Sequence, residues 1–349
     1  MKPEPFRIEP KFVPRIWGAR SLAPLFPERS DLREPIGEVW LTGVDCKVAS
    51  GSFSGKTLGE AWREMPPEWR GTKLTATADF PILVKFIFPT DKLSVQVHPD
   101  DAYAASHEQA AGGHGKTEMW HAVSAGPGAR VLVGLVPKAK AEHFLRAIET
   151  QSLEDLFVHW RVQPGDTFFV PAGTPHTIGP GMVLCEVQEH SDLTYRVYDY
   201  GRVDAHGKPR ELHIEKALDV IEFGRPISGK TSRIHLPGHG MQKSLLTACR
   251  YFASERWKIT APIGVHSDPE HFDLLVILSG RGNFTWGSAP ATYLNGECWL
   301  VPAGLGNFSV NPDEPSKLLR TYVPDLAALR ANLERAGYSW QEIAKTVFD

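Results

Sequence analysis

The sequence predicts a mainly β fold built from two related barrels, with a few helices between them and at the C-terminus. Two observations lead to this prediction. Glycine (31 residues) and proline (28 residues) are spread between short apolar runs, a pattern typical of many strands joined by turns. One motif also occurs twice, as GDTFFVPAGTPHTI at 165–178 and as GECWLVPAGLGNFS at 296–309. Such self-similarity indicates a duplicated structural unit.

The two copies of the motif align at an offset of 131 residues. Gly165 matches Gly296, VPAG at 170–173 matches VPAG at 301–304, and His176 matches Asn307. Two similar turns could arise by chance in such a chain, but the length of the matched run argues against this. We expect a first domain over residues 1–230 and a second over 231–349, with the Gly-, Pro- and His-rich stretch 225–242 as linker. We expect the second copy, which lacks the histidine, to bind no metal.

The elements expected along the chain follow from composition and periodicity. The first 75 or so residues show no clear pattern and are expected to be irregular. Segments rich in β-branched and aromatic residues predict strands over 81–88, 93–98, 116–123, 130–135, 165–171, 182–188 and 193–200. Helical spacing is found over 139–156 and 211–223, and Asp100 or Asp101 is a suitable N-cap for another short helix. A β-rich stretch (245–323) and two helices (324–336 and 340–347) complete the chain.

Composition excludes several classes of protein. The net charge of −3 argues against a strongly basic nucleic-acid binder. No apolar run approaches the ~18 residues of a membrane span, and the N-terminus lacks the apolar core of a signal peptide. The four cysteines lie far apart with no CxxC pair, so we expect reduced, mostly buried thiols in a cytoplasmic protein.

Four polar residues have the spacing of a metal site. In Gln96-Val97-His98 the first and third side chains leave one face of a strand, and Lys116-Thr117-Glu118 repeats this arrangement. His176 follows a Pro-Ala-Gly-Thr-Pro turn that would hold it at a strand end. Each signal alone is weak, because a lone buried histidine is usually a hydrogen-bonded core residue. Together, two imidazoles, a carboxylate and an amide oxygen suit a cation such as Zn²⁺ and leave positions open for substrate.

Four runs in order resemble the type I mannose-6-phosphate isomerase family, particularly its shorter bacterial members. They are QVHPDD (96–101), GKTEMWH (115–121), VPAGTPHTIG (170–179) and EVQEHSDLTYRVYDYGR (186–202). The resemblance implies two cupin-type (jelly-roll) barrels, and interconversion of mannose 6-phosphate and fructose 6-phosphate. It also implies one zinc ion per chain, or another divalent metal, at Gln96, His98, Glu118 and His176. Lys85, Ser94, Lys116, Arg196 and Arg202 match positions that the family places around its substrate pocket.

Each matched residue has an expected role and a plainer alternative. Arg196 would stabilise the charge of an enediolate, or would form a structural ion pair with Asp192 or Asp199. Lys116 or Glu186 would move the carbon-bound proton; otherwise Lys116 is a surface lysine and Glu186 orients a metal ligand. The candidates for holding the phosphate are Lys85, Ser94 and Arg202.

The chain departs from the family pattern in two places. Some relatives carry a histidine where this chain has Gly115, and His114 is one place out of register. The long insertions of larger members are absent, which leaves the depth of the pocket open. We expect His235, His239, His266 and His271 to be linker and loop residues rather than a second metal site.

Three rival functions follow from the same residues. They are a non-catalytic or regulatory sugar-binding cupin, a metal-dependent cupin oxygenase, and an isomerase of a related sugar. The expected partner is a small sugar phosphate, with no nucleic acid or membrane, and the chain is expected to be a monomer or a weak homodimer.

Overall fold

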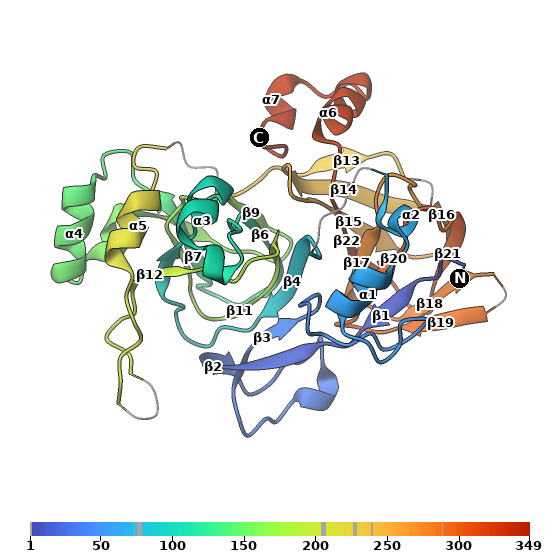
Figure 1. Cartoon of the computed structure of the whole chain (residues 1–349), viewed down its shortest axis with the longest axis horizontal. Helices are drawn as coiled ribbons and strands as arrows, with labels where there is room; N and C mark the ends of the chain where they lie inside the picture. The colour runs from blue at the N-terminus through green and yellow to red at the C-terminus, as the bar shows by residue number, and fades with distance from the viewer. Residues whose placement is uncertain are drawn as a thin grey trace.

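The computed structural model describes residues 2–72, 74, 79–203, 207–225, 229–238, 240–287 and 289–349. It confirms the mainly β prediction, because four antiparallel sheets make up most of the chain. Figure 1 shows them as two β units side by side, the first in blue to yellow-green and the second in orange and red. Each unit contains two sheets.

The first unit pairs a six-stranded sheet with a five-stranded one. The six-stranded sheet has the order β2 (Lys11–Ala19), β3 (Ile36–Trp40), β4 (Ile82–Ile87), β11 (Met182–Glu189), β6 (Glu118–Ala125), β9 (Thr167–Val170). The five-stranded sheet has the order β12 (Tyr195–Tyr198), β5 (Val95–Val97), β10 (His176–Ile178), β7 (Arg130–Leu135), β8 (Phe157–Arg161). Buried side chains from both sheets, such as Trp120, Leu184, Val131 and Ile178, form one cluster between them.

The second unit pairs a seven-stranded sheet with a four-stranded one. The larger sheet has the order β1 (Phe6–Ile8), β20 (Cys298–Val301), β17 (Asp273–Ser279), β22 (Ser316–Tyr322), β15 (Ala253–Ile259), β14 (Met241–Ala248), β13 (Ile234–Leu236). The smaller has the order β16 (Ile263–His266), β21 (Asn307–Pro312), β18 (Gly282–Trp286), β19 (Ala289–Tyr293). Trp257, Leu275, Phe284 and Phe308 fill the space between these sheets.

The two units repeat one another strand for strand. The order β9-β6-β11-β4-β3-β2 of the first recurs as β20-β17-β22-β15-β14-β13 in the second. The sequence repeat falls on equivalent strands: His176 begins β10 and Asn307 begins β21. Gly165 and Gly296 precede these strand pairs with φ of 90° and 78°, a backbone conformation that favours glycine. The duplication inferred from the motif is therefore confirmed.

The sheets remain open. Throughout the described ranges, no strand pairing connects the two sheets of a unit, so each unit is a two-sheet sandwich without a closed ring of strands. Its sides are held by packing of apolar side chains instead of backbone hydrogen bonds. One end of the first sandwich is thereby free to carry polar residues between its sheets.

The larger sheets of the two units pack back to back. Val84 and Cys185 of the first unit and Leu274 and Leu319 of the second belong to one buried cluster. The six-stranded sheet is therefore buried on both faces, which explains why β4 reads as a continuous apolar run. The division at residue 230 stays a prediction, although β1 pairs with β20 of the second unit.

The prediction of an irregular N-terminal region was wrong. Residues 6–8, 11–19 and 36–40 form β1, β2 and β3, because partners distant in sequence complete their hydrogen bonds. Several expected helices are shorter than predicted. The segment 139–156 splits into α4 (Ala141–Glu149) and a 3-10 turn (Leu153–Leu156), with Gln151 between them at a φ of 57°. The segment 211–223 contains α5 (Ile214–Val220).

The other helices lie at the edges of the units. They are α1 (Leu58–Glu64), α2 (Pro67–Arg70), α3 (Asp101–His107), α6 (Leu326–Arg335) and α7 (Trp340–Ile343), with 3-10 turns at Pro27–Arg29 and Gln109–Ala111. Asp100 is the N-cap of α3, and it is one of the two residues expected at this position. Figure 1 shows α6 and α7 beside β13 and β14. None of the described helices has the length and apolarity needed to cross a bilayer, and all four cysteines are buried free thiols, as expected.

Candidate metal centre and adjoining cavity

Strand pairing gathers the four predicted metal ligands at one end of the first unit. Gln96 lies in β5 directly opposite His176 of β10, and His98 follows β5 by one residue. Glu118 begins β6 in the facing sheet. The sequence spacing of Gln96 and His98 thus places both residues beside His176, while Glu118 approaches from the other sheet. All four side chains therefore meet between the sheets.

The distances at this point suit a single small cation. The Nε2 atom of His176 lies 3.3 Å from Oε1 of Glu118, and the Nε2 atom of His98 lies 3.6 Å from Oε2. The amide of Gln96 is 3.2 Å from Nε2 of His176. Ligand atoms of His98, Glu118 and His176 all lie within 4.8 Å of one another. Rotation of the Gln96 amide would present its oxygen to the same point.

Backbone hydrogen bonds fix which imidazole nitrogen faces the centre. Nδ1 of His98 lies 2.8 Å from the carbonyl of Leu193, and Nδ1 of His176 lies 2.8 Å from the carbonyl of Thr174. Because a carbonyl only accepts, each Nδ1 carries the proton and each Nε2 keeps its lone pair. Nε2 of His98 and Oε1 of Glu118 are buried without a hydrogen-bond partner, while Oε2 of Glu118 faces the ammonium of Lys116 at 2.9 Å. Buried polar atoms left in this state are costly, and a cation at the centre would satisfy them.

Burial also sets the protonation of the ligands. It lowers the pKa of His98 well below the ordinary value and lowers that of His176 to about 4, so both rings are neutral, as metal ligands must be. Burial raises the pKa of Glu118 to about 7, although Lys116 acts in the opposite direction with its ammonium 2.9 Å from Oε2. A bound divalent cation would favour the ionised carboxylate. The donor set therefore fits a metal.

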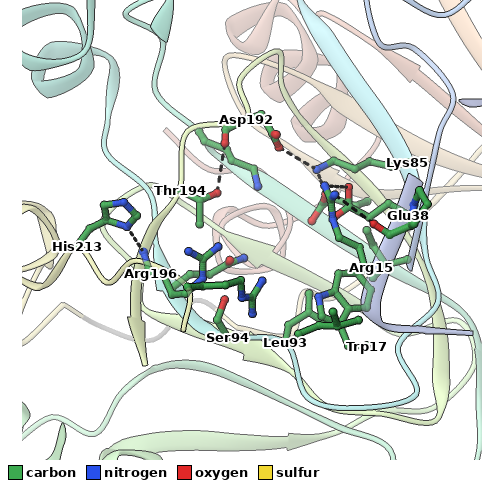
Figure 2. A pocket seen from close by; sticks show the side chains of 17 residues that line it. Arg15, Trp17, Glu38, Lys85, Leu93, Ser94, Asp192, Thr194, Arg196 and His213 are labelled. Atoms are coloured by element: carbon green, nitrogen blue, oxygen red, sulfur yellow. Dashed lines mark hydrogen bonds and ion pairs between the residues drawn. The ribbon is translucent and has the colours of Figure 1, made fainter. Parts of the chain in front are cut away.

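A cavity of ≈ 530 Å³ opens beside the centre. Gln96, Lys116 and Glu186 lie on its wall, together with residues of β2, β4 and β12. Figure 2 shows Arg15, Glu38 and Lys85 on one side of the cavity, Arg196 and His213 on the other, and Ser94 and Leu93 between them. Several fixed charges thus surround a space whose size is ordinary for a small-molecule site.

Lys85 and Glu186 form a buried pair on this wall. They stand directly opposite each other in β4 and β11, with Nζ 3.1 Å from Oε2. Trp120 donates to the other oxygen of Glu186 at 3.0 Å. Burial raises the pKa of Glu186, but Lys85 and Lys116 outweigh it and lower the pKa to about 2. Glu186 is therefore a fixed, ionised carboxylate.

The arginines that line the cavity differ from those expected from the sequence. Arg196 lines the cavity and, among the described residues, forms no ion pair, because Asp199 instead binds Arg202 at 2.6 Å and also Arg210. Arg202, a predicted phosphate contact, is absent from the cavity wall and also reaches Asp91. Arg210 lies on the wall, as does Arg15. No local motif marks Arg15 or Arg210, and their positions follow only from the fold.

Gly115 occupies a position where a side chain would not fit. A Cβ there would lie 2.5 Å from the backbone nitrogen of Asp101. The histidine that some relatives carry at this place would therefore require a different path of the chain. The neighbouring His114 lines a separate cavity and supplies no ligand atom to the metal centre. Its backbone carbonyl accepts a hydrogen bond from the hydroxyl of Ser191.

Comparison with known proteins shows the family of the chain. The chain is 35% identical over 321 residues to the mannose-6-phosphate isomerase ManA of Bacillus subtilis, covering 89% of this chain and 96% of that protein. The chain belongs to the type I mannose-6-phosphate isomerase family. The model of the type I phosphomannose isomerase catalytic domain matches residues 6–124, which hold three of the four expected metal ligands of this family member.

Solved structures of mannose-6-phosphate isomerases share the fold. The crystal structure of the Bacillus subtilis mannose 6-phosphate isomerase superimposes with a TM-score of 0.83 at 28% identity, over 91% of this chain and 99% of that one. A zinc-bound mannose 6-phosphate isomerase gives a TM-score of 0.69 at 16% identity, over 91% and 99% of the two chains. The duplicated sandwich is thus the fold of this isomerase family.

Proposed function

We propose that this chain interconverts mannose 6-phosphate and fructose 6-phosphate as a metal-dependent isomerase. The observation that carries the proposal is a buried, metal-competent His–Glu–His group beside a cavity lined by fixed cations. A non-catalytic sugar-binding protein has no need of an unsatisfied, buried ligand set next to ionised Glu186. A coupled isomerase assay with metal-replete protein tests the proposal, and ligand binding without turnover would refute it.

We further propose that His98, Glu118 and His176, with Gln96 as the fourth ligand, hold one Zn²⁺ per chain. Two neutral imidazoles and oxygen donors suit zinc, although such a set also accepts other divalent ions. A bound divalent cation would supply Lewis-acid stabilisation to oxygens of the sugar. A cytoplasmic location and a monomeric or weakly dimeric state stay predictions.

Glu186 is our candidate for the base that moves the carbon-bound proton. Both of the groups proposed for this role, Lys116 and Glu186, lie on the cavity wall. Lys116 is held by its ion pair with Glu118 at 2.9 Å. Glu186 is ionised, so its carboxylate is ready to accept a proton, and Lys85 and Trp120 orient it. The atom that takes the proton from carbon is therefore an oxygen of Glu186, which then returns it to the neighbouring carbon.

Arg196 is placed to stabilise negative charge on the reacting oxygens. Its backbone pairs with that of Gln96, so its side chain enters the cavity beside the metal centre. The carbonyl of Glu211 accepts from Nη1 at 3.0 Å and holds the guanidinium, whose Nε is buried without a hydrogen-bond partner. Such a fixed cation acts more strongly on the transition state than on the ground state.

Substituting Arg196→Ala is therefore expected to lower kcat by roughly 10²-fold with only a modest change in KM. Steady-state kinetics with saturating metal measure both constants. Arg202→Ala is the matched control, because its guanidinium lies off the wall on Asp199, and we expect a much smaller loss of kcat. A rise in KM alone for Arg196→Ala would instead assign this residue to phosphate binding.

The phosphate of the sugar requires cations away from the metal centre. Of the residues expected for this role, Ser94 and Lys85 lie on the cavity wall, where Lys85 is paired with the candidate base Glu186, and Arg202 lies outside. Arg15 and Arg210 take their place on the wall, each already oriented by a carboxylate: Glu38 at 2.9 Å and Asp199 at 2.8 Å. We propose that Ser94, Arg15 and Arg210 hold the phosphate.

Arg210→Gln is expected to raise KM for mannose 6-phosphate by roughly 10- to 100-fold, the range that corresponds to loss of one charge-assisted hydrogen bond. Any slow turnover of unphosphorylated mannose should remain nearly constant, because that sugar makes no phosphate contact. Kinetics on both sugars check this. Equal losses on both would show that Arg210 acts on the reacting end of the substrate.

A further inference from the structure

A second polar cavity lies where the two units meet, away from the proposed isomerase site. It encloses ≈ 310 Å³ and shares no lining residue with the cavity beside the metal centre. One wall is His121 and its neighbours in β6, and the other is formed by β15, β17 and β22 of the second unit. Four cationic side chains reach it: Arg233, Arg256, Lys258 and Lys317.

The four cations stand close together without counter-ions. Lys258 of β15 lies directly opposite Lys317 of β22, and Arg256 lies two residues from Lys258 on the same face. Like charges directly opposite each other on paired strands destabilise a sheet. Within the part of the chain that the structure describes, none of the four cations forms an ion pair with a carboxylate. The protein itself therefore does not offset this repulsion.

Arg256 is the most deeply placed of these cations. It is 7% exposed, and its Nε is buried without a hydrogen-bond partner. Its guanidinium lies against Gly165 of the first unit, where an added Cβ would come within 3.2 Å of Nη1. A guanidinium whose Nε is buried without a partner, and which has no carboxylate beside it, is unfavourable unless something outside the chain satisfies it.

The positive charges also affect the pKa values of Lys258 and His121, which line the same cavity. Arg256, followed by burial and by Lys317 and Arg233, lowers the pKa of Lys258. Burial, followed by Arg256, Arg233 and Lys317, lowers the pKa of His121 to about 3, so this imidazole is neutral. Its Nδ1 lies 2.9 Å from Oγ1 of Thr167, which leaves Nε2 for another partner. Each cation thus makes the charged form of its neighbours less favourable, and a bound anion would offset this repulsion for all of them.

We propose that this cavity binds a phosphate group, either as inorganic phosphate or carried by a small phosphorylated molecule. A planar guanidinium and several ammonium groups are the donors that proteins use for phosphate oxygens. The volume admits a small molecule rather than a macromolecular surface. Because the wall comes from both units, a bound phosphate would tie them together and stabilise their interface.

Calorimetric titration of the full-length protein tests this proposal at fixed ionic strength, with inorganic phosphate and ribose 5-phosphate as separate probes. Binding is read without turnover, so the result does not depend on isomerase activity. The proposed isomerase cavity also attracts phosphate, and for this reason the titration is performed in an Arg210→Gln background. In this background the isomerase cavity should bind phosphate at least about tenfold more weakly, and the affinity of the other site should fall at least about tenfold in Lys317→Gln and in Lys258→Gln, the loss expected for one charge-assisted contact. Tighter binding of either probe identifies the source of the phosphate group.

Thermal unfolding provides a second test, because the proposal predicts the direction in which the Tm changes. Without phosphate, Lys317→Gln is expected to raise the Tm, because it removes one of two opposed charges. With phosphate, the wild-type Tm should rise while that of Lys317→Gln changes little. Lys138→Gln is the matched control, since this exposed lysine lies far along the first unit in the turn after β7 and should behave as wild type. Wild-type phosphate affinity and an unchanged Tm shift in both lysine variants would overturn the proposal.

Discussion

Replacing His176 by alanine is expected to abolish metal binding and to lower isomerase activity by roughly 10³-fold, since loss of the cation removes several kcal/mol of charge stabilisation. His176 is fully buried, and its Nε2 points at Glu118 from 3.3 Å while Nδ1 is held by the Thr174 carbonyl. No other described histidine can replace it in the His98–Glu118 group. Elemental analysis of the purified protein should give about one metal ion per wild-type chain and almost none in the variant.

The fold should largely survive this change. The apolar core between the sheets of the first unit is made by residues such as Trp120, Phe168 and Leu184, and the second unit has a core of its own. Circular dichroism should therefore show wild-type strand content in His176→Ala. His271→Ala is the control, because it removes a buried histidine of the second unit that contacts Asp273 rather than the metal group. Full activity in metal-free wild-type protein would contradict the assignment of the centre.

The metal content also tests the second copy of the repeat. Asn307 stands where the first unit has His176, and its side-chain oxygen lies 2.9 Å from Nδ1 of His266 near the protein surface. We expect no second equivalent of tightly bound metal in wild-type protein. An ion found beside Asn307 would show that the second unit retains a metal site.

Glu186→Gln should have the second-largest effect, a loss of roughly 10²- to 10⁴-fold in kcat, the range for removal of a general base. The amide keeps the shape of the side chain and its contact with Trp120, but it does not accept a proton from carbon. Metal content should remain at the wild-type level, which separates this variant from His176→Ala. Exchange of the C2 deuteron of labelled mannose 6-phosphate with solvent should be lost in Glu186→Gln. Lys116→Gln should retain this exchange, and the opposite pattern would assign the base to Lys116.

Lys85 provides a pH test of the same assignment. Its ammonium is among the groups that lower the pKa of Glu186 to about 2, so removing it should raise that pKa. A base acts only when deprotonated, and its activity is lost as the pH falls through its pKa. Lys85→Met is therefore expected to move the acid limb of the kcat/KM profile to higher pH. An acid limb identical to that of the wild type would show that Glu186 does not carry the titration.

The candidate metal ligands could be read from the sequence because their signals are local. Alternation along a strand places Gln96 and His98 on one side, and a rigid turn precedes His176. The repeated VPAG motif revealed the duplication, because its glycines and strand starts are fixed by backbone conformation within a few residues. These features need no knowledge of which strands pair.

The rest of the site depends on partners far apart in the chain. Lys85 meets Glu186 only because β4 and β11 pair in that register, which no local feature of the sequence indicates. Arg210 rather than Arg202 lines the cavity, although the guanidinium groups of both bind Asp199.

The sequence by itself determined the mainly β class, the duplication and the candidate metal ligands, since period, turn chemistry and donor type are properties of neighbouring residues. Tertiary structure alone decided that the sheets stay open, that β1 joins the second unit, and which charges face each cavity. The physical reason is that sheet register and packing between units bring together residues whose separation in sequence carries no local signal.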